Sequence, residues 1–206
     1  MRTLTEQKRT DIINAASAVF LEQGYERASM DSVAKQAGCS KATLYNYFAS
    51  KESLFEAVVR CFSTNFLMRA ADELNHPETQ SLLLSEKLQR FGEGMLGALT
   101  SDWKALQLYR MVVGEAGYSD IGALFHESGV RESMNALTAV MEHHIASGEL
   151  IGGSPALRAK QFSALVKAEV DELFLQRTLP NYTKSEVRTM VQNAVSLFLR
   201  GAGHNI

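Results

Sequence analysis

Residues 29–48, S-M-D-S-V-A-K-Q-A-G-C-S-K-A-T-L-Y-N-Y-F, decide the fold of this chain because they predict two short helices joined by a tight turn. Small and apolar residues at helical spacing give the first helix one buried face, namely Val33, Ala34 and Ala37. Gly38 ends that helix, since glycine readily takes the left-handed conformation that follows many helix C-termini. Ser40 is the expected N-cap of the second helix. The segment therefore predicts a helix-turn-helix.

The second helix of this motif separates into an inward pair and an outward face. Leu44 and Phe48 are four residues apart, so both point toward the core. The remaining positions carry a cation, a hydroxyl, an amide and two phenols: Lys41, Ala42, Thr43, Tyr45, Asn46 and Tyr47. Such a face suits phosphates and base edges. The alternative is that the two tyrosines are core aromatics, but Leu44 and Phe48 already occupy the inward face, so we favour exposure.

Two flanking segments extend the motif, I-I-N-A-A-S-A-V-F-L-E-Q-G-Y at 12–25 and A-S-K-E-S-L-F at 49–55. Together, residues 12–55 closely resemble the N-terminal domain of the TetR family of bacterial transcriptional regulators. The resemblance implies a three-helix DNA-binding domain at 6–66, whose second motif helix enters the major groove while the first crosses the DNA backbone. The chain departs from the family at Ala28, where Thr is frequent, which leaves Ser29 alone as the expected hydroxyl at that helix start.

The resemblance also implies which residues contact DNA. The expected set is Ser29, Ser40, Lys41, Ala42, Thr43, Tyr45, Asn46, Tyr47 and Lys51. The expected readers of base edges are Thr43, Lys41 and Asn46. Lys51 begins a predicted helix, whose N-terminal backbone donors also favour a phosphate. Lys8 and Arg9, near the start of a helix predicted at 6–23, either approach the DNA backbone or form a solvated helix face.

The composition is that of an ordinary soluble globular protein of 206 residues, of which 46% are hydrophobic and 21% charged. No apolar run approaches the ~18 residues of a membrane span, and the first ten residues lack the apolar core of a signal peptide. Two cysteines, Cys39 and Cys61, make neither a disulfide framework nor a metal site. We therefore expect a cytoplasmic protein of one or two small domains without a membrane partner.

The net charge of −2 is unevenly distributed along the chain. Residues 1–51 carry seven Lys/Arg against five Asp/Glu, whereas the remainder carries 14 against 18. The N-terminal part is therefore mildly basic and the rest acidic, which predicts modest affinity for DNA per half-site. Useful operator affinity would then need a dimer.

The remainder of the chain also reads as helical, so we predict an all-α fold of about nine helices. A long helix is predicted from Lys51 to about Leu74, and further helical segments follow at about 78–100, 102–116, 120–147, 155–178 and 183–201. Residues 107–129, Q-L-Y-R-M-V-V-G-E-A-G-Y-S-D-I-G-A-L-F-H-E-S-G, resemble the C-terminal domain of the AefR-like subgroup of the family. This second resemblance implies a ligand-responsive regulator, with a ligand-binding and dimerisation domain at 67–206.

A ligand pocket is expected inside that domain, between the helices that begin near residues 82, 103 and 121. The residues expected to line it are Phe91, Met95, Trp103, Tyr109, Met111 and Phe125. This soft, aromatic lining suits an apolar or planar ligand, although each residue taken singly also fits a plain core. A glycine inside a helix lowers the helix's stability by about 1 kcal/mol relative to Ala. Four glycines nevertheless lie within these helical segments: Gly92, Gly94, Gly97 and Gly114. Either a ligand or close helix packing uses the space they leave.

The last two long helices carry apolar stripes at three-four spacing. Each stripe either packs on its own protomer or faces a partner, and apolar residues off the stripes, such as Leu175, Leu197 and Leu199, favour a partner. The family dimerises through its last two helices, and the resemblance implies the same here. The expected interface residues are Phe162, Leu165, Val166, Leu173, Val187, Met190, Val191, Ala194 and Phe198.

No group of residues in the sequence indicates catalysis or a bound metal. His143 and His144 are adjacent and therefore point about 100° apart on a helix, so they cannot easily share a metal, and we expect a surface role for both. The chain has no Ser-His-Asp set, no phosphate-cradling glycine loop and no paired carboxylates in a catalytic context. We expect no enzyme, no cofactor and no metal site.

These observations predict a homodimeric regulator that binds double-stranded operator DNA. We expect a repressor that an unknown small apolar or aromatic effector releases, with two recognition helices in successive major grooves about 34–36 Å apart. The first alternative is an activator or a ligand-blind regulator on the same scaffold. The second is an all-helical enzyme or small-molecule carrier that happens to contain a helix-turn-helix pattern.

Overall fold

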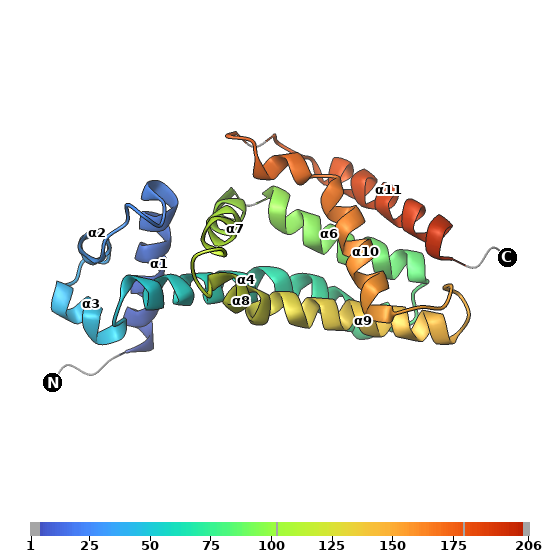
Figure 1. The fold of residues 1–206 in the computed structure, drawn as a ribbon, viewed down its shortest axis with the longest axis horizontal. Helices are drawn as coiled ribbons and strands as arrows, with labels where there is room; N and C mark the ends of the chain where they lie inside the picture. Colours follow the sequence, from blue (N-terminus) through green and yellow to red (C-terminus); the bar gives the residue numbers. More distant parts are fainter. Residues whose placement is uncertain (1–4, 102, 179, 204–206) are drawn as a thin grey trace. The chain divides into compact units, whose positions relative to one another are not determined.

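A computed structural model describes residues 5–101, 103–178 and 180–203, and it shows a chain of helices (Figure 1). The described part contains no β-strand, and an isolated antiparallel bridge joins Leu150 to Gly203. The α-helices are α1 (Glu6–Gln23), α2 (Met30–Gln36), α3 (Lys41–Tyr47), α4 (Lys51–Asn75), α5 (Pro77–Gln80), α6 (Leu84–Ser101), α7 (Trp103–Glu115), α8 (Ile121–Phe125), α9 (Arg131–Ala146), α10 (Pro155–Ala168) and α11 (Lys184–Ala202). None of these helices is long and apolar enough to cross a membrane, as far as the chain is described.

The all-α prediction is confirmed, but three of the predicted segments are interrupted. A short α5 precedes α6, so the segment at 78–100 is two helices. The segment at 120–147 contains a π-helical turn, η1 (His126–Val130), where Gly129 has non-helical angles of φ 168° and ψ −33°. The segment at 155–178 ends as a helix at Ala168 and continues as a 3₁₀ turn, η2 (Asp171–Phe174), which buries Leu173. Two of these breaks divide a predicted segment into two α-helices, which gives the eleven α-helices of the described part where about nine helices are predicted.

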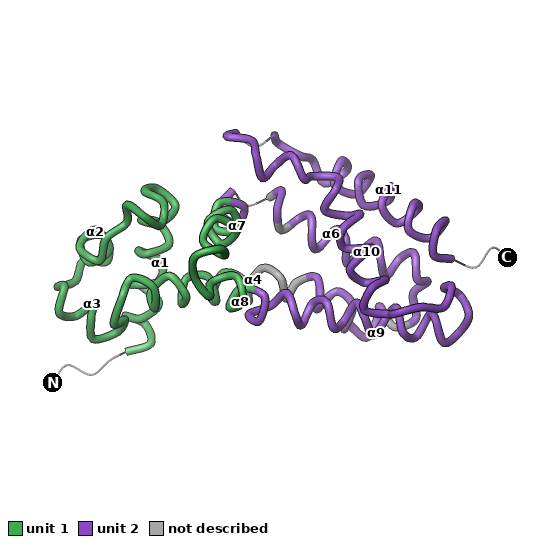
Figure 2. Tube along the Cα trace, viewed as in Figure 1, with its two compact units in different colours: residues 1–62, 107–125 green, residues 63–106, 126–206 purple. Residues whose placement is uncertain are grey.

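The chain divides into two compact units that are not contiguous in sequence (Figure 2). Unit 1 comprises residues 1–62 and 107–125, and unit 2 comprises residues 63–106 and 126–206. The sequence predicts two contiguous domains divided at 66/67, whereas this division groups 107–125 with the N-terminal helices. Helix α4 contributes its first half to unit 1 and its second half to unit 2.

Local capping determines where the helices of unit 1 begin and end. Helix α1 spans the predicted 6–23 and stops at Gly24, which has a φ of 77°. Ser29 and Ser32 form a capping box at the start of α2, and Ser40 caps α3. Gly38 takes the left-handed conformation between them, with a φ of 58°, as predicted. The turn of the helix-turn-helix is therefore set by residues within the motif itself.

An aromatic cluster forms part of the core of unit 1. The ring of Phe55 lies 5.0 Å from that of Phe20 and 4.6 Å from that of Tyr25, measured between centroids. Phe20 and Phe55 are almost fully buried. Tilted and edge-on aromatic pairs at this range are favourable, so the cluster joins the end of α1 to the start of α4.

Unit 2 is built around α6, α9, α10 and α11. Helix α10 packs against α9, α11 and α6, and α11 also packs along α6 (Figure 1). The core contains side chains from each of these helices: Leu88, Phe91, Leu137, Met141, Phe162, Val166, Val191 and Phe198. Contacts between helices far apart in sequence therefore hold this unit together.

Two of the four singled-out glycines allow helices to approach closely. A Cβ at Gly92 would collide with Cγ1 of Val191 on α11, and a Cβ at Gly94 would lie 3.2 Å from the backbone Cα of Ala70 on α4. Of the two explanations for these glycines, close helix packing is therefore confirmed at both positions. At Gly97 and Gly114, an added Cβ would meet no heavy atom within 4 Å in the described part.

Candidate functional site

Helix α3 exposes the polar face that its sequence predicts. Leu44 has no exposed surface and Phe48 is only 4% exposed, so both belong to the core of unit 1. Of the motif residues expected to contact DNA, Thr43 and Tyr47 are half-buried and the others are exposed, namely Ser29, Ser40, Lys41, Ala42, Tyr45 and Asn46. The separation into an inward pair and an outward face is therefore confirmed. The contacts of this face with DNA stay a prediction.

The hydroxyls of Ser29 and Ser40 lie at the N-termini of α2 and α3. Ser40 Oγ accepts a hydrogen bond from the backbone N–H of Thr43 at 3.1 Å, and it lies 2.8 Å from Thr43 Oγ1. Ser29 Oγ accepts in the same way from Ser32 N–H at 3.1 Å. The caps satisfy backbone donors of the first turn and hold the Thr43 hydroxyl beside the start of α3, where a groove-inserted helix contacts bases.

Lys41 forms an ion pair that the sequence does not predict. Its Nζ lies 2.6 Å from Oδ1 of Asp31 on α2, and both side chains are largely exposed. The hydrogen bond to Asp31 and its negative charge raise the pKa of Lys41. A phosphate or base contact by Lys41 therefore competes with Asp31, and this carboxylate is also a repulsive charge beside any DNA on this face.

Tyr47 connects the end of α3 to the start of α1. Its phenol oxygen accepts a hydrogen bond of 2.8 Å from the backbone N–H of Thr5. Thr5 is the N-cap of α1, so the bond orients two helix ends relative to each other. The phenol hydrogen of Tyr47 is still a donor available to an acceptor such as a phosphate oxygen.

Lys51 holds the connection between α1 and α2. Its Nζ donates to the carbonyl oxygens of Tyr25 at 3.0 Å and Glu26 at 3.3 Å, and it lies 4.4 Å from the centroid of the Tyr25 ring. The Tyr25 hydroxyl in turn donates to Oε1 of Glu52 at 3.4 Å. Burial, followed by the charge of Glu52, raises the pKa of Tyr25 to about 12. The predicted phosphate contact of Lys51 would require its ammonium to leave these carbonyls.

The two basic residues at the start of α1 also have partners within the unit. Lys8 Nζ donates to the carbonyl of Ala37 at 2.9 Å, at the C-terminus of α2, where a cation is favourable. The guanidinium carbon of Arg9 lies 5.1 Å from the centroid of the Phe48 ring, within the range of a cation–π contact. Neither residue is simply a solvated charge.

The predicted dimer interface requires a correction, because most of its residues belong to the core of unit 2. Phe162, Val166 and Val191 have no exposed surface, and the rings of Phe162 and Phe198 lie 5.3 Å apart. Leu173, Val187 and Ala194 are also buried, and Leu165 and Met190 are half-buried. The buried stripes pack on α6 and on each other, so they cannot be the surface that a partner touches. The exposed residues of α10 and α11 include small or apolar ones and also charged ones, among them Ala156, Leu157, Lys160, Ala164, Lys167, Ala168, Arg188, Leu197, Arg200 and Gly201.

The six residues predicted to line a ligand pocket are divided between the units. Phe91, Met95 and Trp103 belong to unit 2, whereas Tyr109, Met111 and Phe125 belong to unit 1. Phe91 is buried against Phe162, with centroids 6.3 Å apart, and Trp103 is 48% exposed. In unit 1 the rings of Tyr109 and Phe125 lie 5.5 Å apart. Their role in ligand binding stays a prediction.

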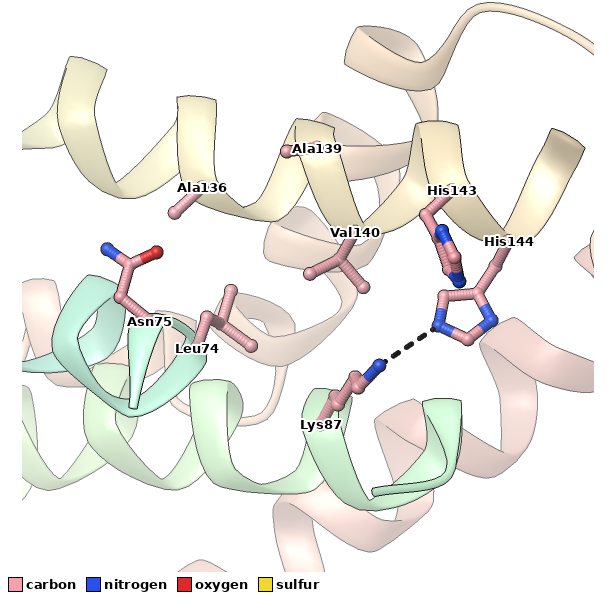
Figure 3. Close-up of a pocket in the computed structure, with 8 residues that line it drawn as sticks. All are labelled: Leu74, Asn75, Lys87, Ala136, Ala139, Val140, His143 and His144. Atoms are coloured by element: carbon pink, nitrogen blue, oxygen red, sulfur yellow. Dashed lines mark hydrogen bonds between the residues drawn. The ribbon is translucent and has the colours of Figure 1, made fainter. Parts of the chain in front are cut away.

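A pocket that the sequence does not predict lies within unit 2 (Figure 3). It has a volume of about 390 Å³, within the range of small-molecule sites. Its lining comes from the end of α4, the first turns of α6 and one side of α9: Leu74, Asn75, Lys87, Ala136, Ala139, Val140, His143 and His144. We call this the α4–α6–α9 pocket.

His144 lies at one end of this pocket, and its predicted surface role is wrong. It is only 7% exposed, whereas His143 is exposed as expected. The Nδ1 atom of His144 is 2.6 Å from Oε2 of Glu149, and its Nε2 is 3.5 Å from Nζ of Lys87. Among the described residues, no group of three or more His, Cys, Asp or Glu side chains is placed to hold a metal ion. One signal for burial was available, because His144 continues the helical stripe of Leu137 and Met141.

Two models of protein families match the chain. Residues 12–58 match a model described as bacterial regulatory proteins, tetR family. Residues 86–201 match a model described as AefR-like transcriptional repressor, C-terminal domain. The second match alone spans more than half of the chain.

Individual proteins are similar over different lengths. UidR, an HTH-type transcriptional regulator of Escherichia coli K12, is 42% identical over 59 residues, which are 29% of this chain and 30% of UidR. FasR, an HTH-type transcriptional activator of Mycolicibacterium smegmatis, is 44% identical over 55 residues, 27% of this chain and 25% of FasR. These curated relatives are thus matched over less than a third of their length. The solved structure of the flavonoid-responsive regulator FrrA is 30% identical, covers 98% of this chain and 100% of FrrA, and has a TM-score of 0.76.

Proposed function

Because the chain belongs to the TetR family of bacterial regulatory proteins, we propose that it is a homodimeric, ligand-responsive transcriptional regulator that binds operator DNA. We further propose that it represses transcription until a small molecule releases it. A cytoplasmic location follows from this role, since the operator is there.

The observation that carries the proposal is the outward face of α3. This helix is anchored by Leu44 and Phe48 and capped by Ser40, and it presents Lys41, Tyr45 and other polar side chains to solvent. A helix carried on such an anchor can enter the major groove without disturbing the core of unit 1. Its polar groups match phosphate oxygens and base edges.

A homodimer is proposed because α3 is short. Seven residues of helix reach only a few base pairs, so specific binding needs two copies on two half-sites. The proposed interface uses the exposed faces of α10 and α11 in place of their buried stripes. Leu197 is 61% exposed and Leu157 is 53% exposed, and the small residues beside them permit close approach of a partner helix.

Repression is proposed from the C-terminal match, whose family model is described as a transcriptional repressor. The alternative is activation, which the name of FasR illustrates for a relative that matches in the N-terminal part. The name of FrrA describes a response to flavonoids, which supports a small effector for this chain as well. The effector would act by binding the DNA-competent and DNA-released states with different affinity.

A matched pair of tyrosine variants tests DNA binding by α3. Tyr45 is 44% exposed on α3, and Tyr118 is 90% exposed elsewhere in unit 1. Tyr45→Ala should weaken binding to DNA from upstream of the protein's own gene by about 10-fold, measured by fluorescence anisotropy, whereas Tyr118→Ala should bind like wild type. Equal affinity of both variants and wild type, together with unchanged binding by Thr43→Ala, would exclude α3 as the DNA-binding helix.

A further inference from the structure

The α4–α6–α9 pocket is polar at its ends and apolar between them (Figure 3). Lys87, His143 and His144 lie at one end, and the amide of Asn75 lies at the other. Between them, Leu74 and Val140 face the cavity together with the methyl groups of Ala136 and Ala139. Leu74 is only 7% exposed, so the apolar section has a buried floor. This arrangement fits a molecule that has an apolar body and one polar head.

The polar head that fits is an anion. The eight lining residues include no carboxylate, and Lys87 forms no ion pair with any acidic side chain in the described part of the chain. Its Nζ has one polar neighbour there, Nε2 of His144 at 3.5 Å. Since an ammonium group has three N–H donors, at least two remain for a ligand. An anion bound here would gain charge-assisted hydrogen bonds.

The contact between His144 and Glu149 fixes how the histidine takes part. A separation of 2.6 Å between Nδ1 and a carboxylate oxygen requires a proton between them, so Nδ1–H donates to Glu149. Since an ammonium group has no acceptor, Nε2 is the acceptor in the 3.5 Å contact with Lys87 and holds its ammonium at the pocket end. Glu149 lies on the far side of the ring from Lys87, because the two residues bind opposite nitrogens. His143 lies beside this group, with its ring 5.0 Å from that of His144.

We propose that the α4–α6–α9 pocket binds a small amphipathic carboxylate. The carboxylate accepts hydrogen bonds from Lys87 and His143, and the apolar body lies against Leu74, Ala136 and Val140. A carboxylate is favoured over a phosphate because the site offers one fixed ammonium and no guanidinium fork, and because about half of the lining is apolar. That such a molecule is the effector rests on the proposed function, whereas its binding does not.

The binding test uses the full-length protein without DNA and a series of probe compounds. The probes are 4-phenylbutyrate, its neutral amide 4-phenylbutyramide, acetate as a head without a body, and inorganic phosphate. Isothermal titration calorimetry or ligand-observed NMR should show 4-phenylbutyrate binding at least 10-fold more tightly than the other three. If the amide binds as tightly as 4-phenylbutyrate, the negative charge does not contribute to binding. If acetate binds as tightly, the apolar section of the pocket does not contribute. If phosphate binds more tightly than 4-phenylbutyrate, the site is a phosphate site and the proposed carboxylate is wrong. If 4-phenylbutyrate does not bind at millimolar concentration, the proposal is overturned.

Variants place the compound in the pocket. Lys87→Met removes the ammonium with little change of side-chain length, and it should weaken 4-phenylbutyrate at least 10-fold. Lys184→Met removes a charge from an exposed position on α11 and should bind like wild type. Ala139→Leu fills the cavity from an exposed helix position and should also abolish binding while the thermal unfolding curve stays that of wild type. Wild-type affinity in either Lys87→Met or Ala139→Leu would show that the compound binds elsewhere.

The same compounds then separate this proposal from the proposed function. If 4-phenylbutyrate binds through Lys87 and also weakens operator binding, the pocket is the effector site. If it binds through Lys87 and leaves operator binding unchanged, the binding site stands and its effector role fails. If operator DNA is not bound under any condition, the proposed function fails, and the calorimetric result still decides whether the pocket binds a carboxylate.

Discussion

Helices α3 and α11 have the same design but relate differently to their surroundings. Each helix has an apolar stripe along one side and a second face outside that stripe. In α3 the stripe is Leu44 with Phe48, and the face left over is polar. In α11 the stripe includes Val191 and Phe198, which lie in the core of unit 2, and the face left over includes Leu197 at 61% exposed.

The difference shows how a functional surface must be read from a helix. In both helices the stripe is buried in the core of the protomer. A binding partner can therefore contact only the face outside the stripe. For α3 the remaining residues are polar, and the exposure predicted for them is confirmed, while their contact with DNA stays a prediction. For α11 the sequence predicts the stripe itself as the interface, but a stripe at three-four spacing is equally typical of a core helix, and here the stripe is buried. Leu197 lies off the stripe and is 61% exposed, so it belongs to the surface that we propose a partner touches.

The largest expected effect comes from removing a stripe residue of α11. Phe198→Ala should lower the free energy of unfolding by about 3–5 kcal/mol, because it leaves a cavity among Phe162 and its neighbours. Urea denaturation followed by circular dichroism measures this loss. Ser196→Ala, on the exposed side of α11, serves as the control and should change stability by no more than about 0.5 kcal/mol. If the unfolding midpoint of Phe198→Ala is the same as that of wild type, Phe198 does not contribute to the core of unit 2.

A change on the opposite face of α11 should separate assembly from folding. Leu197→Arg should give a folded monomer by light scattering, because a charge at the centre of an apolar contact is not tolerated. Its operator affinity should fall by about 100-fold, since the two half-sites are no longer bound together. Val113→Arg, which changes an exposed valine in unit 1, should stay dimeric. A dimeric Leu197→Arg would place the interface elsewhere.

A change at the start of α3 should have a smaller effect on stability. Ser40→Ala removes the N-cap that accepts from Thr43 N–H, and it should cost about 1 kcal/mol of unfolding free energy. Ser40→Asp restores a good cap but places a negative charge near the proposed phosphates. The second variant should therefore recover thermal stability while binding operator more weakly than Ser40→Ala. Stronger operator binding by Ser40→Asp would contradict the position proposed for DNA.

The smallest expected effect is a gain of DNA affinity. Asp31→Asn removes the carboxylate that holds Lys41 at 2.6 Å, so the ammonium is released and a repulsive charge is lost. Operator affinity should rise several-fold, and its dependence on salt should steepen by up to about one released counterion. A loss of affinity would show that Asp31 orients Lys41 for DNA instead of competing with it.

The parts of the fold that depend on neighbouring residues could be predicted from the sequence. The range of α1, the left-handed Gly38 and the caps at Ser29 and Ser40 follow from chemistry within a few positions of the chain. The outward face of α3 followed as well, because Leu44 and Phe48 define the opposite side of the same helix.

The parts that depend on distant partners could not be predicted. The sequence predicts a phosphate contact for Lys51, but its ammonium donates to the carbonyls of Tyr25 and Glu26, more than twenty positions earlier. The α4–α6–α9 pocket is assembled from three helices, and no local pattern relates Lys87 to His144. The space beside Gly94 is likewise filled by Ala70 of another helix. Such features become visible only when the packing is known.

Guanine methylation protection on the operator tests the central claim most directly, because it reports major-groove occupancy base by base. The wild-type protein should protect two symmetric half-sites whose centres lie about one helical turn, or a whole multiple of it, apart. At a protein concentration just sufficient to saturate the operator with wild type, Tyr45→Ala should show weaker protection of both half-sites together, and Leu197→Arg should show none. Protection of one groove only, or identical protection by wild type and Tyr45→Ala, would contradict a dimer that reads DNA through two copies of α3.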